Sequence, residues 1–196
     1  MSLYRVAAAS AALLALSACN APASEPAAAP KEAPPATAPA TPAGPVLTPE
    51  GLGPIKIGMT EAEVIAAVGA DRVVGDTGSD FEGCKEMQLK GDLVGTWVMF
   101  EEGKVTRVSI GDDGQGGVST AKTDKGLGIG STAAEVRAAY PALKSEPHKY
   151  EGPGAEYLTV WTTPDKAGIN FETGENGKVK TIHGGADSIQ YVEGCA

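Results

Sequence analysis

The sequence predicts an α+β fold made of two tandem helix-plus-antiparallel-meander units, with the helices packed on one sheet face. The first observation is an internal repeat: the segments 57–68 and 129–140 share eight identical residues in twelve positions. The second is that each copy precedes short apolar runs separated by Gly-containing turns, a pattern typical of antiparallel strands. Helices followed by a run of strands favour the α+β class.

The first unit is predicted to span residues 47–115. Thr60 and Glu63 have the capping-box spacing, in which the threonine oxygen and the glutamate carboxylate each accept a backbone N–H at the helix start. Gly69 is a residue type that commonly ends a helix. Three strands are expected next, at 81–89, 94–101 and 104–110, with turns at 90–92 and 102–103.

The second unit is predicted to span residues 116–196. Thr132 and Glu135 repeat the capping box, and Pro141 ends the helix. The expected strands are 157–163, 168–173 and 178–183, followed by a last strand near 188–192.

The N-terminal segment Leu16-Ser17-Ala18-Cys19 closes a short apolar run that follows the single positive charge of Arg5. This arrangement resembles a bacterial lipoprotein signal peptide, which implies cleavage of residues 1–18 and lipid attachment to the Cys19 thiol. Asn20 after the cysteine is compatible with sorting to the outer membrane, facing the periplasm. The alternative is an ordinary secretory signal that contains a cysteine by chance.

The segment that follows, residues 19–46, is predicted to be a disordered tether that begins at the lipidated cysteine. Residues 20–46 hold 10 Ala and 8 Pro among 27 positions. Proline at this density favours extended polyproline II structure and leaves few side chains able to form a core. The tether is therefore expected to act as a spacer between membrane and folded domain.

The charge of the chain limits its partners. Loss of residues 1–18 removes one positive charge, so the net charge changes from −9 to −10. Nucleic acids and anionic membrane surfaces attract basic patches, so neither is expected as the main partner. Contact with the membrane is expected through the N-terminal lipid alone.

Two cysteines remain once Cys19 carries lipid. Cys84 and Cys195 are expected to form a disulfide, because exported proteins fold in an oxidising compartment. This bridge would close a loop of about 110 residues and restrict the unfolded chain. The alternative is two separate buried thiols.

The repeat resembles the SmpA/OmlA family of small outer-membrane lipoproteins, which assist the β-barrel assembly machinery. The residues that carry the resemblance are Gly58-Met59-Thr60, Val64, Val68-Gly69, Phe100 and Gly103-Lys104-Val105. A related unit occurs in tandem in the β-lactamase inhibitory proteins, which bind enzymes across an exposed sheet. The second copy departs from the pattern at Ser131 and Tyr140-Pro141. The resemblance implies the fold class and a binding role, not a specific partner.

No motif predicts catalysis, a cofactor or a metal site. His148 and His183 lie far apart in sequence and are interpreted as two solvated histidines, since no neighbouring spacing completes a four-ligand metal site. Asp112-Asp113-Gly114 is interpreted as a polar turn, because it lacks the alternating ligands of a calcium loop. No Gly-x-Ser-x-Gly segment marks a nucleophile. The chain is therefore predicted not to be an enzyme.

Three aromatic residues are candidate binding residues: Trp97, Trp161 and Tyr157. Aromatic side chains dominate the energetics of protein interfaces, so any that face outward from the sheet would be natural anchors. The alternative is that they pack in the core.

The leading hypothesis is therefore a lipid-anchored envelope lipoprotein that acts as a non-catalytic protein-binding or assembly-accessory module for another envelope protein. A second hypothesis is a periplasmic inhibitor of a hydrolase of the lysozyme or protease type. A third is a hydrolase with an unrecognised site, which would show titratable groups with displaced pKa values clustered in a pocket.

Overall fold

The structure is a computed structural model that describes residues 44–76, 81–163 and 166–195. These residues belong to one unit, 37–196, which contains both predicted repeats. The predicted signal peptide, Cys19 and nearly all of the tether lie outside the described residues. None of the helices in the described part of the chain is long and apolar enough to cross a membrane.

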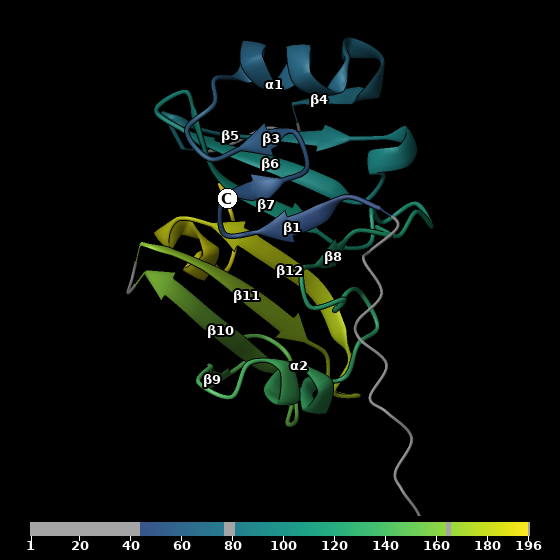
Figure 1. Ribbon diagram of the computed structural model, residues 1–196, viewed down its shortest axis with the longest axis vertical. Helices are drawn as coiled ribbons and strands as arrows, with labels where there is room; N and C mark the ends of the chain where they lie inside the picture. Colours follow the sequence, from purple (N-terminus) through teal and green to yellow (C-terminus); the bar gives the residue numbers. More distant parts are fainter. Residues whose placement is uncertain (1–43, 77–80, 164–165, 196) are drawn as a thin grey trace, which may run out of the picture. The chain divides into compact units, whose positions relative to one another are not determined.

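The dominant element is an eight-stranded antiparallel sheet (Figure 1). From one edge to the other, its strands are β4 (Val73–Asp76), β5 (Cys84–Leu89), β6 (Thr96–Glu101), β7 (Lys104–Ile110), β12 (Val179–Gly185), β11 (Ala167–Thr173), β10 (Glu156–Thr163) and β9 (Lys144–Pro147).

The predicted α+β class with two helix-plus-meander units is wrong. Strand residues outnumber helical residues, 43% against 17%, and both meanders belong to one sheet. They join where β7 pairs with β12, with Ser109 opposite His183 and Ile110 opposite Ile182. The physical reason is that a separate meander would leave the backbone N–H and C=O groups of its edge strand unpaired. When the two edge strands pair with each other, the backbone N–H and C=O groups of both strands form hydrogen bonds.

Six strands, β5, β6, β7, β10, β11 and β12, nevertheless lie within three residues of their predicted positions, whereas β4 and β9 were not predicted. The β6–β7 connection also agrees, because Glu102 and Gly103 both have positive φ, 49° and 74°. Positive φ at both central residues is what a type I′ hairpin turn requires.

Two short helices begin at the predicted capping boxes. They are α1 (Glu61–Val68) and α2 (Ala133–Ala139). The backbone N–H of Thr60 donates to Glu63 at 2.7 Å, and that of Thr132 donates to Glu135 at 2.7 Å. These hydrogen bonds stabilise the charged carboxylates, so the pKa of each glutamate lies below its ordinary value.

A second sheet of four very short strands was not predicted. It has the order β3 (Ile55–Lys56), β2 (Gly51–Leu52), β1 (Val46–Thr48) and β8 (Lys122–Thr123). Runs of two or three residues among Pro and Gly carry too little periodicity to indicate strands. The sheet is nonetheless part of the core, because Leu47, Leu52 and Ile55 are fully buried.

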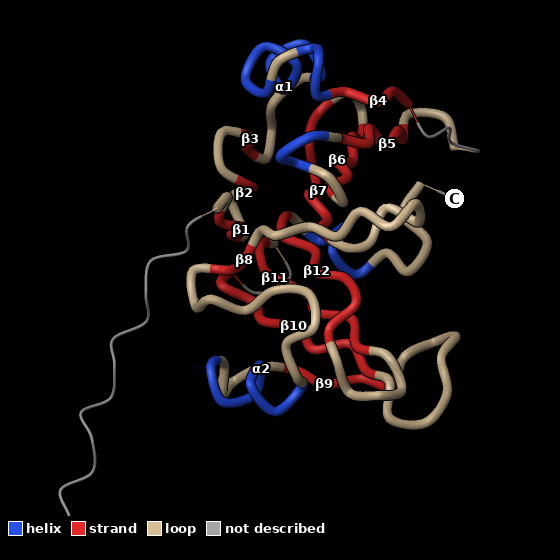
Figure 2. The backbone as a smooth tube through the Cα atoms, turned by 90° about the vertical axis from the view of Figure 1, so that its right-hand side faces the viewer, coloured by secondary structure: helices blue, strands red, loops and turns tan. Residues whose placement is uncertain are grey.

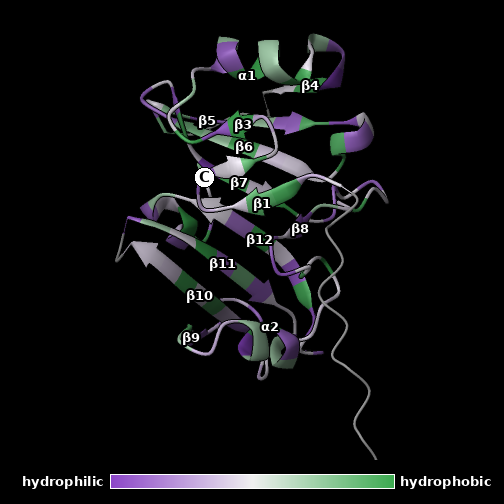
Figure 3. Cartoon of the chain, in the orientation of Figure 1, coloured by the Kyte–Doolittle hydropathy of each residue, from purple (hydrophilic) through white to green (hydrophobic). Residues whose placement is uncertain are grey.

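The hydrophobic core lies on one face of the large sheet. Residues of α1, α2 and the small sheet share a buried cluster with this face. Figure 2 shows these elements on one side of the large sheet and the C-terminus on the other. Figure 3 shows hydrophobic bands that alternate with paler and purple bands along β10 and β11. Side chains alternate between faces along a strand, so the opposite face, which we call the polar face, receives the intervening residues.

The last segment, residues 187–195, is called here the C-terminal strap, and it lies on the polar face. The predicted strand near 188–192 is wrong, because Asp187–Gln190 forms a 3-10 helix. β12 already pairs with β7 and β11, so the chain that follows it has no adjacent edge to join. The predicted disulfide is present and links Cys195 of the strap to Cys84 of β5, with Cα atoms 5.5 Å apart.

We predict that Gly184→Ala destabilises the fold. A Cβ at Gly184 would lie 2.6 Å from the Thr48 carbonyl oxygen, so the small sheet would have to move away from β12. The expected loss of unfolding free energy is about 1–3 kcal/mol, typical of overpacking. Gly44→Ala is the matched control, since its nearest atom, Thr120 O, is 3.9 Å away. Urea denaturation measures both; equal midpoints would contradict the prediction.

Candidate functional site

Polar side chains from three central strands meet on the polar face. β7 contributes Arg107 and Ser109, β12 contributes His183, and β11 contributes Asn170 and Glu172. The register places His183 between Ser109 on one side and Asn170 on the other. The pairing of β7 with β12 therefore brings together residues that are more than 60 positions apart in sequence.

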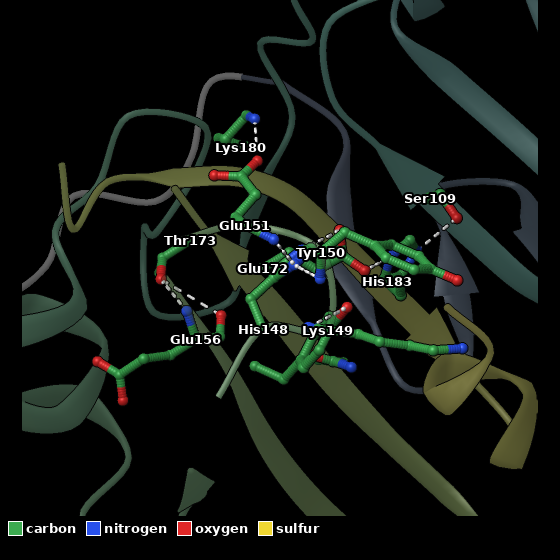
Figure 4. Close-up of polar contacts among 12 residues, drawn as sticks. Ser109, His148, Lys149, Tyr150, Glu151, Glu156, Glu172, Thr173, Lys180 and His183 are labelled. Carbon is green, nitrogen blue, oxygen red and sulfur yellow. Dashed lines mark hydrogen bonds and ion pairs between the residues drawn. The ribbon is translucent and has the colours of Figure 1, made fainter. Parts of the chain in front are cut away.

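Ser109, His183 and Glu172 form a hydrogen-bonded chain (Figure 4). Ser109 Oγ lies 2.7 Å from His183 Nδ1, and His183 Nε2 lies 3.0 Å from Glu172 Oε1. An ionised Glu172 accepts a hydrogen bond from Nε2–H, which leaves Nδ1 to accept the hydrogen bond of the Ser109 hydroxyl. The order of contacts is that of a serine, a base and an orienting carboxylate.

The pKa values of this pair reflect its burial. Burial, together with the charge of Arg107, lowers the pKa of His183 below its ordinary value of 6.5. Burial opposes ionisation of Glu172, but the hydrogen bond from His183 and nearby positive charge outweigh it, so the pKa of Glu172 is also lowered. At neutral pH, His183 is therefore neutral and Glu172 is charged.

His148 approaches Glu172 from outside the sheet. Its Nδ1 accepts the backbone N–H groups of Tyr150 and Glu151, both at 3.2 Å, so its remaining ring proton is on Nε2. Nε2 lies 4.0 Å from Glu172 Oε2, and the ring stacks on Tyr157 with centroids 4.4 Å apart. The prediction of two solvated histidines is therefore wrong, because the His148 and His183 side chains are only 11% and 8% exposed and both imidazoles face one carboxylate.

Arg107 fastens the C-terminal strap to this face. Its Nη1 donates to the carbonyl oxygens of Ser188, at 3.1 Å, and Tyr191, at 2.9 Å. Its Nη2 lies 2.9 Å from Glu86 Oε1 on β5. A buried arginine requires such partners, because an uncompensated charge in this position costs several kcal/mol.

Two pockets open on the polar face and share Glu172, Tyr191 and Val192 as lining residues. The first has a volume of about 330 Å³ and is called here the tyrosine pocket; its other lining residues are Glu146, Pro147, Tyr157, Asn170 and Gln190. The second has a volume of about 280 Å³ and is called here the histidine pocket; its other lining residues are Glu86, Trp97, Arg107, Ser109, Thr181, His183, Glu193 and Gly194.

The three predicted binding aromatics lie on the polar face by their strand register. Tyr157 lines the tyrosine pocket and Trp97 lines the histidine pocket. Trp161 is half-buried, opposite Gly168, and lines neither of these pockets. The structure thus brings Tyr157 and Trp97 to the two sides of the strap and leaves Trp161 apart from them.

Sequence reasoning did not find Ser109, Glu172, Asn170 or Arg107. A signal was present, because these polar residues alternate with apolar ones along β7 and β11. The alternation shows which residues share a face, but not that β7 and β12 are neighbours.

Glu63 and Glu135 serve as helix caps, as predicted. The 112–114 segment is a polar turn, as predicted, with Asp112 Oδ1 accepting the Gly114 N–H at 2.8 Å.

Comparison with known proteins gives no relative: no protein family, curated protein or solved structure matches this chain. The resemblance to SmpA/OmlA lipoproteins and the internal repeat therefore stay predictions. Within residues 44–76, 81–163 and 166–195, no group of three or more His, Cys, Asp or Glu side chains is placed to hold a metal ion.

We predict that the free energy of unfolding decreases as pH falls below about 6.5, and that His183 causes much of this dependence. The unfolded histidine binds a proton below this pH, whereas the folded one resists it because its pKa is lowered. The unfolded state therefore binds more protons, and stability rises with pH by up to about 1.4 kcal/mol per unit. Urea denaturation from pH 7.5 to 5.5 measures the slope. His183→Gln should flatten it; an unchanged slope would contradict the assignment.

Proposed function

We propose that this chain is a lipid-anchored lipoprotein of the cell envelope, held at the outer membrane by Cys19 and facing the periplasm. Its folded part would be a non-catalytic module that binds another envelope protein. The anchor is supported by the small residues before Cys19 and by the Ala/Pro-rich spacer that follows it. The spacer would let the folded part contact its partner away from the membrane.

The observation that carries the binding role is the polar face with its two pockets. Tyr157 and Trp97 line these pockets, and the more exposed Tyr191 lies between them. Tyr150, 59% exposed, donates a hydrogen bond to Glu193 of the strap and extends the aromatic surface. Aromatic side chains with neighbouring pockets are typical of the centres of protein interfaces.

Site-specific photo-crosslinking tests this role in living cells. A photoreactive amino acid placed at Trp97 or Tyr157 should give discrete protein adducts, because both positions line pockets of the proposed interface. The readout is the mass and identity of the adduct.

Val118 is the matched control position, since it is 43% exposed and belongs to neither pocket. Adducts at Trp97 and Tyr157 that are absent at Val118 support the proposal. Equal labelling at all three positions, or none at any, would refute a partner bound at the polar face.

A second candidate function, hydrolysis of an acyl bond, is favoured by one observation, the Ser109–His183–Glu172 chain. In such a step the Ser109 oxygen would attack an acyl carbon while its proton passes to His183 Nδ1. Glu172 would stabilise the resulting imidazolium, the leaving group would take the proton, and water would release the acyl group. Ser109 is only 5% exposed, so substrate would have to enter through the histidine pocket.

A fluorophosphonate probe separates the two candidates. The binding role predicts no covalent adduct, because a buried serine in a structural network is unreactive. Intact-protein mass spectrometry gives the answer, with Ser109→Ala as the control. A stoichiometric adduct on Ser109 that this variant lacks would replace the binding role with the hydrolytic one.

A further inference from the structure

We propose that the tyrosine pocket receives a guanidinium group, the chemistry of an arginine side chain, presented by the envelope protein that docks on the polar face. The inference rests on the proposed binding function and adds the chemistry that the partner must carry. Three features of the pocket support it: a largely buried carboxylate with no Lys or Arg partner among the described residues, an acceptor without a donor, and aromatic lining residues.

The carboxylate is Glu172, whose side chain is 18% exposed. Its ion-pair neighbours in the described structure are imidazoles, His183 at 3.0 Å and His148 at 4.0 Å, and no Lys or Arg pairs with it there. Arg107 also lies on this face but is committed to Glu86 and to the strap. A largely buried carboxylate is stabilised by a cation, and a bound guanidinium would supply one.

The acceptor is Asn170, which is 3% exposed. Its Nδ2 donates to the Ile189 carbonyl oxygen at 3.0 Å, which fixes the orientation of the amide. Oδ1 is buried and has no hydrogen-bond partner among the described residues. An orphaned acceptor is rare in folded proteins and is costly to leave unmatched, so a ligand that brings an N–H donor would be favoured.

The walls of the pocket favour a planar cation. Tyr157, Tyr191 and Pro147 line the pocket with ring side chains, and Glu146, which pairs with Lys144, adds a second carboxylate, whereas none of the described lining residues is Lys or Arg. A guanidinium stacks on aromatic rings and offers five N–H donors in one plane. It can therefore satisfy carboxylate and amide oxygens together, which a compact ammonium does less well.

The net charge of the chain, −9, also favours the approach of a cationic partner. This attraction is long-range and does not select a site. The selection would come from the tyrosine pocket, where Glu172 has no Lys or Arg partner among the described residues.

Nuclear magnetic resonance titration of the full ¹⁵N-labelled chain in a neutral detergent tests the inference. The probe is N-acetyl-arginine N′-methylamide, and the control probe is the citrulline analogue, which has nearly the same shape and no charge. The arginine probe should shift the Asn170 side-chain amide and the Tyr157 backbone amide, with a Kd on the order of millimolar. The citrulline probe should bind at least about tenfold more weakly.

Two variants with the same change in net charge sharpen the test. Glu172→Gln should weaken binding of the arginine probe by about tenfold or more, since it removes the buried charge. Glu61→Gln should leave binding unchanged, because Glu61 pairs with Lys85 away from the pocket. Equal binding of both probes, or no shift at Asn170 and Tyr157 with the arginine probe, would overturn the inference even if Glu172→Gln failed to fold.

The outcomes separate this inference from the proposed function. Protein adducts at Trp97 and Tyr157 without binding of the arginine probe would reject the guanidinium pocket and keep the docking surface. Binding of the probe without adducts would keep the pocket and reject the docked protein.

Discussion

The pairing of β7 with β12 is the constraint on which the rest of the structure depends. It joins two sets of strands into one sheet and gives that sheet two continuous faces. On one face, Val108 and Ile182 complete the core beneath the helices and the small sheet. On the other face, the same register sets Ser109 beside His183. The candidate site is therefore a consequence of the way in which the two halves of the chain pair.

The two faces differ in what covers them. The core face is closed by apolar packing, whereas the polar face carries the C-terminal strap, which Arg107 and the Cys84–Cys195 disulfide hold in place, and the His148 ring stacked on Tyr157. A narrow cover leaves pockets beside it, and these pockets contain buried charged and polar groups. Such groups are costly to bury without partners, so a surface that keeps them accessible is suited to binding polar or charged ligands.

Local features were predictable from the sequence, and long-range ones were not. Capping boxes at Thr60 and Thr132, the turn at Glu102-Gly103 and the disulfide each depend on a few residue types with a specific physical preference. The predicted fold class is wrong because the alternation of residues within a strand does not indicate which strand edges pair. The site residues were not predicted for the same reason, since Glu172 and His183 acquire their roles only through neighbours on other strands.

Native-state hydrogen exchange tests most directly whether the β7–β12 pairing unites the two halves. Amides in β6 and β11, for example those of Val98 and Phe171, are expected to exchange with the same free energy and the same denaturant dependence, because one sheet and one core open together. Exchange of one half at a clearly lower free energy, with a smaller denaturant dependence, would contradict the single sheet as the unit of structure.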